Sequence, residues 1–84
     1  MAKLLEKPEK IKVISNVKGI PLTITRNGKL ERITGIYKHW RVADEWWGEE
    51  VNRDYFTVKT SRGLACDIYH DLVNNLWYLS RIHD

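Results

Sequence analysis

The sequence predicts an all-β fold: a small antiparallel meander of five to seven strands, curled into a barrel or a sandwich. Short segments in which apolar and polar residues alternate recur along the chain, separated by turn residues. Asn27-Gly28 is the strongest short hairpin signal, because both central positions of a type I′ turn need positive φ. No segment reads as a convincing helix, and closure of the sheet would remove exposed strand edges.

The first elements come from the N-terminal half. Residues 1–9 are charged and interrupted by Pro8, which predicts a flexible arm ahead of a single β domain over residues 10–84. Residues 11–14 form a short β-branched run and predict the first strand. Residues 20–25 alternate and predict the second, with Pro21 at its start or on an edge, since proline has no N–H to donate.

A long third strand is predicted over residues 30–42. Thirteen residues exceed the usual strand length, so Gly35 is expected to mark a bulge or bend that lets one strand serve two sides of a curved sheet. Residues 44–52 follow as an acidic loop that turns at Gly48.

Three more strands are predicted over residues 53–60, 64–69 and 77–82. Phe56 and Val58 would lie on one face of the first of these and Tyr55 and Thr57 on the other. Gly63 suits the left-handed position of a short hairpin loop, and residues 71–75 turn the chain once more. The result is about six strands with short connections.

Aromatic residues concentrate in the middle of the chain. Residues 40–58 hold three of the four tryptophans and two of the other five aromatic residues. Trp40 and Trp77 are predicted to be core residues. Trp46 and Trp47 cannot both face inward on a regular strand, because neighbouring side chains point to opposite faces. One of them is therefore expected at the surface, where an exposed tryptophan is a typical anchor for a protein partner.

Several motifs of the second half form a recognisable pattern. They are Arg41-Val42-Ala43-Asp44-Glu45-Trp46-Trp47, Arg53-Asp54-Tyr55-Phe56-Thr57-Val58, Gly63, Ile68-Tyr69-His70-Asp71 and Leu76-Trp77-Tyr78-Leu79. The pattern resembles the C-terminal segment of ImuB-type proteins, catalytically degenerate relatives of Y-family polymerases in bacterial mutagenic repair, and a related small stand-alone bacterial domain. The resemblance covers roughly residues 20–80 and implies an accessory, non-catalytic role in DNA damage tolerance.

Charge is distributed unevenly. Residues 1–43 carry ten Lys/Arg and three Glu, a net of +7, whereas residues 44–84 carry four Lys/Arg and eight Asp/Glu, a net of −4. A basic half can attract phosphates or an acidic protein, but mixed charge also serves solubility alone. Strand alternation places Arg32 and Lys38 on accessible surface, where they would serve a nucleic-acid interface.

Few residues are candidates for chemistry. A catalytic reading would rest on Cys66, His70 and a nearby aspartate, but positions i and i+4 of a strand are about 13 Å apart. Cys66 is better explained as a small buried apolar residue. Histidine and cysteine are too sparse for a metal site, and no phosphate-binding glycine loop is present. We therefore expect no enzymatic activity, no cofactor and no metal.

The sequence thus predicts a non-enzymatic interaction module, with a protein partner, such as a polymerase or repair factor, as its first expectation. The docking residues would be Trp46 and Trp47, together with Arg41, Arg53 and Tyr55. The alternative is a single-stranded nucleic-acid-binding barrel that uses a basic face with Arg32 and Lys38. No apolar run approaches the roughly 20 residues that span a bilayer, so we expect no membrane partner and a cytoplasmic location.

Overall fold

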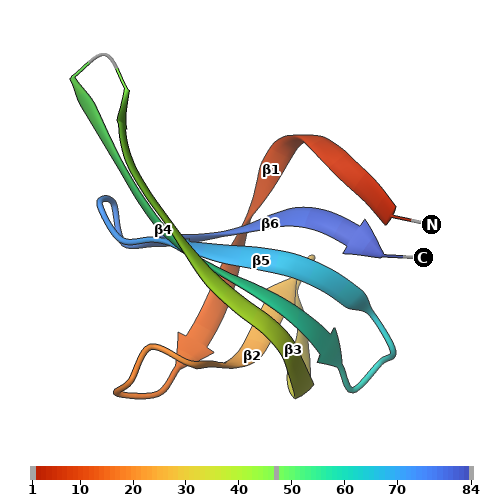
Figure 1. Cartoon of the computed structure of the whole chain (residues 1–84). Coiled ribbons are helices and arrows are strands. Elements are labelled where there is room, and N and C mark those ends of the chain that lie inside the picture. The colour runs from red at the N-terminus through yellow and green to blue at the C-terminus, as the bar shows by residue number, and fades with distance from the viewer. Residues whose placement is uncertain (1, 47, 84) are drawn as a thin grey trace.

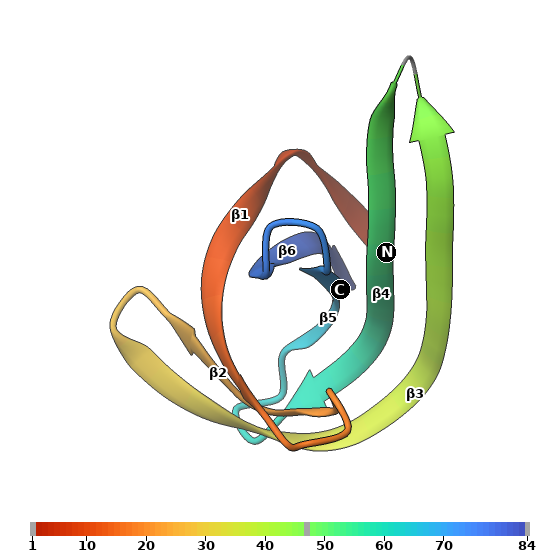
Figure 2. The same ribbon diagram turned by 90° about the vertical axis from the view of Figure 1, so that its left-hand side faces the viewer.

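Six antiparallel strands form a closed barrel in chain order (Figures 1 and 2). A computed structural model describes the backbone over residues 2–46 and 48–83, and the side chains over residues 7–45 and 48–83. The strands are β1 (Ala2–Ser15), β2 (Pro21–Arg26), β3 (Lys29–Trp46), β4 (Glu49–Thr60), β5 (Ala65–Asp71) and β6 (Leu76–His83). Each strand pairs with the next, and β6 pairs back onto β1. The predicted all-β meander is confirmed.

The turns follow the predicted chemistry. Asn27 and Gly28 both have positive φ, 50° and 76°, as a type I′ hairpin between β2 and β3 requires. Gly63 has φ 84° in the turn between β4 and β5. The register of β3 against β4 shifts on both sides of the Gly35–Ile36 step, so the irregularity predicted near Gly35 is present.

The barrel interior is apolar and fully packed. It is lined by one face of each strand, and its buried members are Ile11, Ile24, Phe56, Val58, Cys66, Ile68, Trp77 and Leu79. Trp77 is only 7% exposed, which confirms its predicted place in the core. One carboxylate also lies inside: Glu31 accepts a hydrogen bond of 2.7 Å from the Thr60 hydroxyl, whose oxygen accepts the Leu64 N–H. This partner offsets the cost of burying Glu31.

Trp40 contradicts the prediction that it is a core residue. Its side chain is 39% exposed, because the register places Trp40 opposite Tyr55 on the outer face of the barrel wall. The neighbouring residues His39 on β3 and Phe56 on β4 lie on the opposite face, where Phe56 is buried and the His39 ring stacks on it. The residues of β3 alternate between the two faces as predicted. The bulges in β3 determine which alternate set faces the core.

The ends of two elements also differ from the predictions. Where a flexible arm was expected over residues 1–9, the structure extends β1 to Ala2, and residues 2–4 pair with β6. Where an acidic loop was expected over residues 44–52, β3 and β4 continue as a paired ribbon until Trp46 lies opposite Glu49. Pairing satisfies backbone groups that a loop would leave to water, and Gly48, with φ 84°, allows the tight turn.

The ribbon made by the ends of β3 and β4 rises beyond the rest of the barrel (Figures 1 and 2). In Figure 2 it stands at the right of the molecule, with β3 on its outer side. Over the residues that the structure describes, no helix could serve as a membrane span.

The buried thiol gives a test of the interior. Cys66 is fully buried, and burial raises its pKa to about 12, so the native protein should hold it as an unreactive thiol. We expect dithionitrobenzoate at pH 8 to leave Cys66 unmodified for as long as the chain stays folded, and to titrate one thiol at once in urea. Rapid labelling of the native chain would contradict the barrel interior described here.

Candidate functional site

Four aromatic side chains form a row across the outer face of the barrel, here called the aromatic ladder. Trp40 on β3, Tyr55 on β4, Tyr69 on β5 and Tyr78 on β6 lie directly opposite one another from strand to strand. The centroids of neighbouring rings are 5.2, 4.9 and 5.2 Å apart along this row. Such cross-strand aromatic pairs stabilise a sheet, so the ladder fastens four of the six strands together.

Trp40 and Tyr55 stand face to face, whereas the Tyr55 and Tyr69 rings are tilted by 36° relative to each other. The planes of Trp40 and Tyr55 differ by only 9°, and their separation is close to the spacing between neighbouring strands. Each inner ring therefore packs against a neighbouring ring on both sides, and Tyr69 is only 4% exposed. Trp40 is at the end of the row. Beyond it there is no further described strand, so one face of its indole remains available.

Cations border the ladder. The Arg53 guanidinium lies 4.7 Å from the centroid of the Tyr69 ring, and its Nη1 donates a hydrogen bond of 3.3 Å to the Tyr55 hydroxyl. That bond is the main reason why the pKa of Arg53 is raised, while burial raises the pKa of Tyr69. Lys10 lies opposite Tyr78 at the far end of the row. Arg53 thus closes over the ladder as part of its packing.

A depression of about 430 Å³ lies beside the ladder, and its lining comes from β3, β4, β5 and β6. The lining residues are Lys38, Trp40, Thr57, Asp67, Arg81 and His83. Asp67 at its base accepts a hydrogen bond of 2.6 Å from the Thr57 hydroxyl and lies 2.9 Å from His83 Nε2. Both contacts fall on the same carboxylate oxygen, Asp67 Oδ1. Lys38 and Arg81 give the depression two cations.

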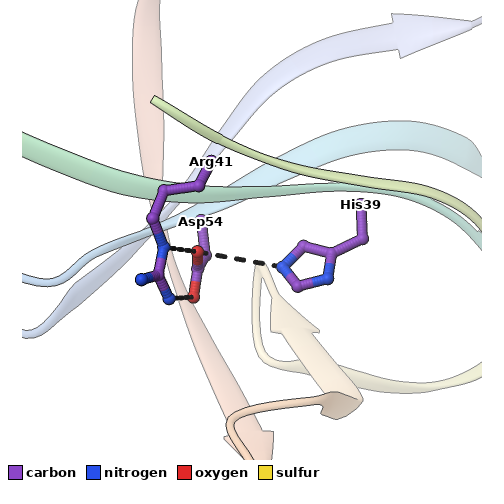
Figure 3. A network of polar contacts seen from close by, with 3 residues as sticks. All are labelled: His39, Arg41 and Asp54. Carbon is purple, nitrogen blue, oxygen red and sulfur yellow. Dashed lines mark hydrogen bonds and ion pairs between the residues drawn. The ribbon is translucent and has the colours of Figure 1, made fainter. Parts of the chain in front are cut away.

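On the opposite face of the ribbon, an ion pair ties β3 to β4 (Figure 3). Arg41 Nε and Nη2 donate to the two oxygens of Asp54 over 2.7 and 3.2 Å, and His39 Nε2 lies 3.8 Å from the same carboxylate. The hydrogen bond from Arg41 lowers the pKa of Asp54, and Asp54 raises the pKa of Arg41. Bidentate geometry of this kind fixes the register of the ribbon as well as pairing the charges.

The outer edge of β3 lacks a neighbour over most of its length. β2 pairs with β3 only along Lys29–Arg32, and β4 occupies the other side. From residue 33 to residue 46, no described strand lies beside the outer edge, as Figure 2 shows. Its exposed large apolar side chains are Ile36, Tyr37, Trp40 and Val42. Natural sheets normally cover or block such an edge, because it offers unpaired N–H and C=O groups to another chain.

The predicted site residues divide between these features. Tyr55, Arg53 and Lys38 all lie on the outer face, with Arg53 and Lys38 on opposite sides of the ladder, whereas Arg41 lies on the other face of the ribbon. Arg32 is exposed but sits where β3 pairs with β2, at the other end of the strand.

The predicted docking corner lies at the tip of the ribbon. Trp47 falls outside the described residues, and Trp46 is described only as the last backbone position of β3. The role predicted for these two side chains stays a prediction.

Sequence reasoning missed Tyr69, Tyr78 and Arg81 as members of the site. Tyr69 and Tyr78 fall in the outward-facing half of a predicted alternating strand. Arg81 was expected on the same face as Trp77 and Leu79, and the register shift between β5 and β6 moves it to the outer face. Which residues of different strands stand opposite each other depends on register, and a shift of one residue would have moved the rings to the other face.

The residues considered for chemistry do not assemble. Cys66 is buried with a raised pKa, and the His70 ring lies flat against Trp77, with centroids 4.4 Å apart. Among the described side chains, no group of three or more His, Cys, Asp or Glu residues is placed to hold a metal ion.

Comparison of the chain with protein-family models, with curated proteins and with solved structures finds no match in any of the three.

The ion pair on the ribbon predicts a dependence of stability on pH. The folded-state pKa of Asp54 is depressed, so its contribution is present above the ordinary value of 3.8 and is lost as the pH falls through the folded value. We expect Asp54→Asn to lower the urea midpoint at pH 7, and the deficit to shrink as the pH falls and Asp54 becomes protonated, because the two chains then carry the same charge. Tryptophan fluorescence follows both transitions.

The matched control for this experiment is Asp44→Asn. Asp44 lies on the same ribbon and caps its own neighbour, accepting the Glu45 N–H over 2.7 Å. Its effect should be the smaller one at pH 7. An Asp54→Asn deficit that stays constant as the pH is lowered through the acid range would show that the carboxylate charge is not what stabilises the ribbon.

Proposed function

We propose that this protein is a non-enzymatic interaction module that takes an extended polypeptide strand of a partner onto the outer edge of β3. The observation that carries the proposal is the long unpaired edge, which is flanked by Trp40 and Val42, 39% and 38% exposed. An added strand forms main-chain hydrogen bonds along such an edge, and its alternate side chains provide specificity.

The regular part of the edge is Lys38–Trp46, where β3 pairs with β4 without any shift in register. The bulges before Lys38 bend the strand and end the flat stretch. The available edge is therefore nine residues long, about the length of a strand that other domains accept. Proline, which would block pairing, is absent from it.

The side chains of the edge suit an apolar partner strand. On the outer face, Trp40 ends the aromatic ladder with one free indole face, and Val42 is the next residue on that face. An aliphatic or aromatic side chain of the incoming strand would extend the row of stacked rings. A rigid aromatic residue of this kind is a frequent anchor at protein interfaces.

The setting that we propose is DNA damage tolerance in bacteria. Support for this comes from the resemblance of roughly residues 20–80 to the C-terminal segment of ImuB-type proteins. Trp40, Tyr55 and the open edge all lie in that region. A strand borrowed from a polymerase or another repair factor would fit both the resemblance and the geometry.

The proposal is tested with peptides selected from a random nine-residue library against the purified chain. We expect selected peptides to shift or protect the amide resonances of Lys38–Trp46, and to lose affinity when N-methylated at one set of alternate positions but not at the other. That pattern is specific to strand addition, because only alternate N–H groups face the edge. Peptides that bind elsewhere, or that ignore N-methylation, would overturn the proposal.

The variant Val42→Lys supplies a matched comparison. It adds charge to the edge and should weaken peptide binding at least tenfold, about 1.4 kcal/mol, whereas Val17→Lys, in the exposed β1–β2 loop, should not. Both residues are exposed, so neither variant disturbs the barrel interior.

A second candidate function is the binding of single-stranded nucleic acid. The observation that favours it is the free face of Trp40 beside Lys38 and Arg81 at the depression. A base stacked on an aromatic side chain contributes roughly 1–3 kcal/mol, and cations hold the backbone. The inner rings give less, because they already stack on one another.

This second function is tested by fluorescence anisotropy with a labelled oligothymidylate at about 50 mM salt, the low end of the range used for salt slopes. We expect Trp40→Ala to abolish binding, and Lys38→Ala to reduce the slope of log K against log salt by about 0.7 for one lost phosphate contact. Lys18→Ala, in the β1–β2 loop, is the control. Absence of any anisotropy change with the unaltered chain would exclude the function.

A further inference from the structure

We infer that the occupant of the open β3 edge is a second copy of this chain, paired antiparallel through β3 about a two-fold axis at Arg41. This inference rests on the proposed function, because it requires that the edge accepts a strand. The partner is identified by how the side chains of the β3 edge match those of a second, antiparallel copy of the same edge.

Backbone geometry restricts how two β3 strands can pair. In an antiparallel strand, the backbone N–H and C=O of one residue both point toward the strand on one side. Those of the next residue both point toward the strand on the other side. Every second residue of β3 forms its backbone hydrogen bonds with β4, so only the backbone groups of the residues in between face the open edge. A symmetric pair must match this set to itself, and the two-fold axis then passes through a residue and not between two residues.

Only a few registers remain along the regular stretch. An axis at Trp40 sets two indoles against each other and places Lys38 opposite Val42. An axis at Val42 sets Trp40 opposite Asp44. An axis at Arg41 sets Lys38 of one copy opposite Asp44 of the other and Trp40 opposite Val42, each twice by symmetry.

The Arg41 register is the one in which the outer face is complementary throughout. Lys38, Trp40, Val42 and Asp44 are all exposed and share that face. Along the strand they are a cation, an aromatic ring, an aliphatic side chain and an anion. In an antiparallel copy the order is reversed, so the cation faces the anion and the ring faces the aliphatic side chain. Opposite charges directly across a sheet and ring–aliphatic pairs both stabilise strand pairing.

The inner face of this register brings the two Arg41 side chains opposite each other. Each guanidinium is already held by Asp54 of its own copy over 2.7 and 3.2 Å. The facing groups are therefore two ion pairs and not two bare cations. His39 lies opposite Ala43 on the same face, and the small alanine leaves room for the imidazole.

Pairing in this register would join the two barrels into one continuous sheet. The aromatic ladder of each copy, Tyr78 to Trp40, would end on Val42 of the other, which covers the free indole face. The interface is short, with seven residues of each copy between Lys38 and Asp44. We therefore expect a weak, concentration-dependent dimer.

Sedimentation equilibrium of the full chain from about 5 to 500 µM, a range that reports weak association, tests the dimer. We expect Lys38→Asp and Asp44→Lys each to raise the dissociation constant at least tenfold, because like charges then face each other twice. The double variant with both changes restores the opposite-charge pairs and should recover the affinity. Lys18→Asp, in the β1–β2 loop, should change nothing.

The register is tested separately by crosslinking. A mixture of Lys38→Cys and Asp44→Cys chains should form an intermolecular disulfide on mild oxidation. Either variant alone should not, since six residues along a strand separate its two thiols by about 20 Å. The native Cys66 does not interfere because it is buried.

The outcomes separate this inference from the function on which it rests. A chain that stays monomeric to the highest concentration, yet binds selected peptides along Lys38–Trp46, overturns the dimer and leaves strand addition standing. A dimer that ignores both single charge reversals uses another surface and also overturns the inference. A monomer that binds no peptide overturns both.

Discussion

The pairing of β3 with β4 is the constraint on which the rest of the structure depends. The two strands stay in contact from the barrel wall to the tip of the ribbon, and the Arg41–Asp54 ion pair locks their register where the ribbon leaves the barrel. This register determines which side chains face the interior. It also carries β3 beyond the reach of β2, and so produces the open edge.

One set of alternating residues supplies the core and the other supplies the site. Phe56 and its inward neighbours fill the barrel, while Tyr55, one residue away, belongs to the aromatic ladder. The inner rings of the ladder and Arg53 fasten β4 to β5 and β6, and Trp40 ends the row at the open edge of β3. Such a row of side chains is rigid, because its members already pack on each other.

Closure of the barrel pairs the strand edges in its body. β1 pairs with both β2 and β6, and the bulges in β1 and β3 bend the strands so that the sheet can meet itself. Among the described residues, β1 and β3 both extend past β2, since β1 pairs with β2 only from Lys12 to Ser15 and β3 only from Lys29 to Arg32. An exposed edge is a hazard for aggregation unless something occupies it, which is why its occupant is the natural question for this protein.

The sequence by itself determined the fold class, the approximate strands, the Asn27-Gly28 turn and the burial of Trp77 and Cys66, because alternation and turn chemistry are local properties. It also selected Arg41, Arg53, Tyr55 and Lys38 as surface residues of interest. It missed the outward position of Trp40, the ribbon in place of an acidic loop, and the row that Tyr69 and Tyr78 complete. Those features depend on bulges and on register between distant strands, and only the tertiary structure decides which residues stand opposite each other.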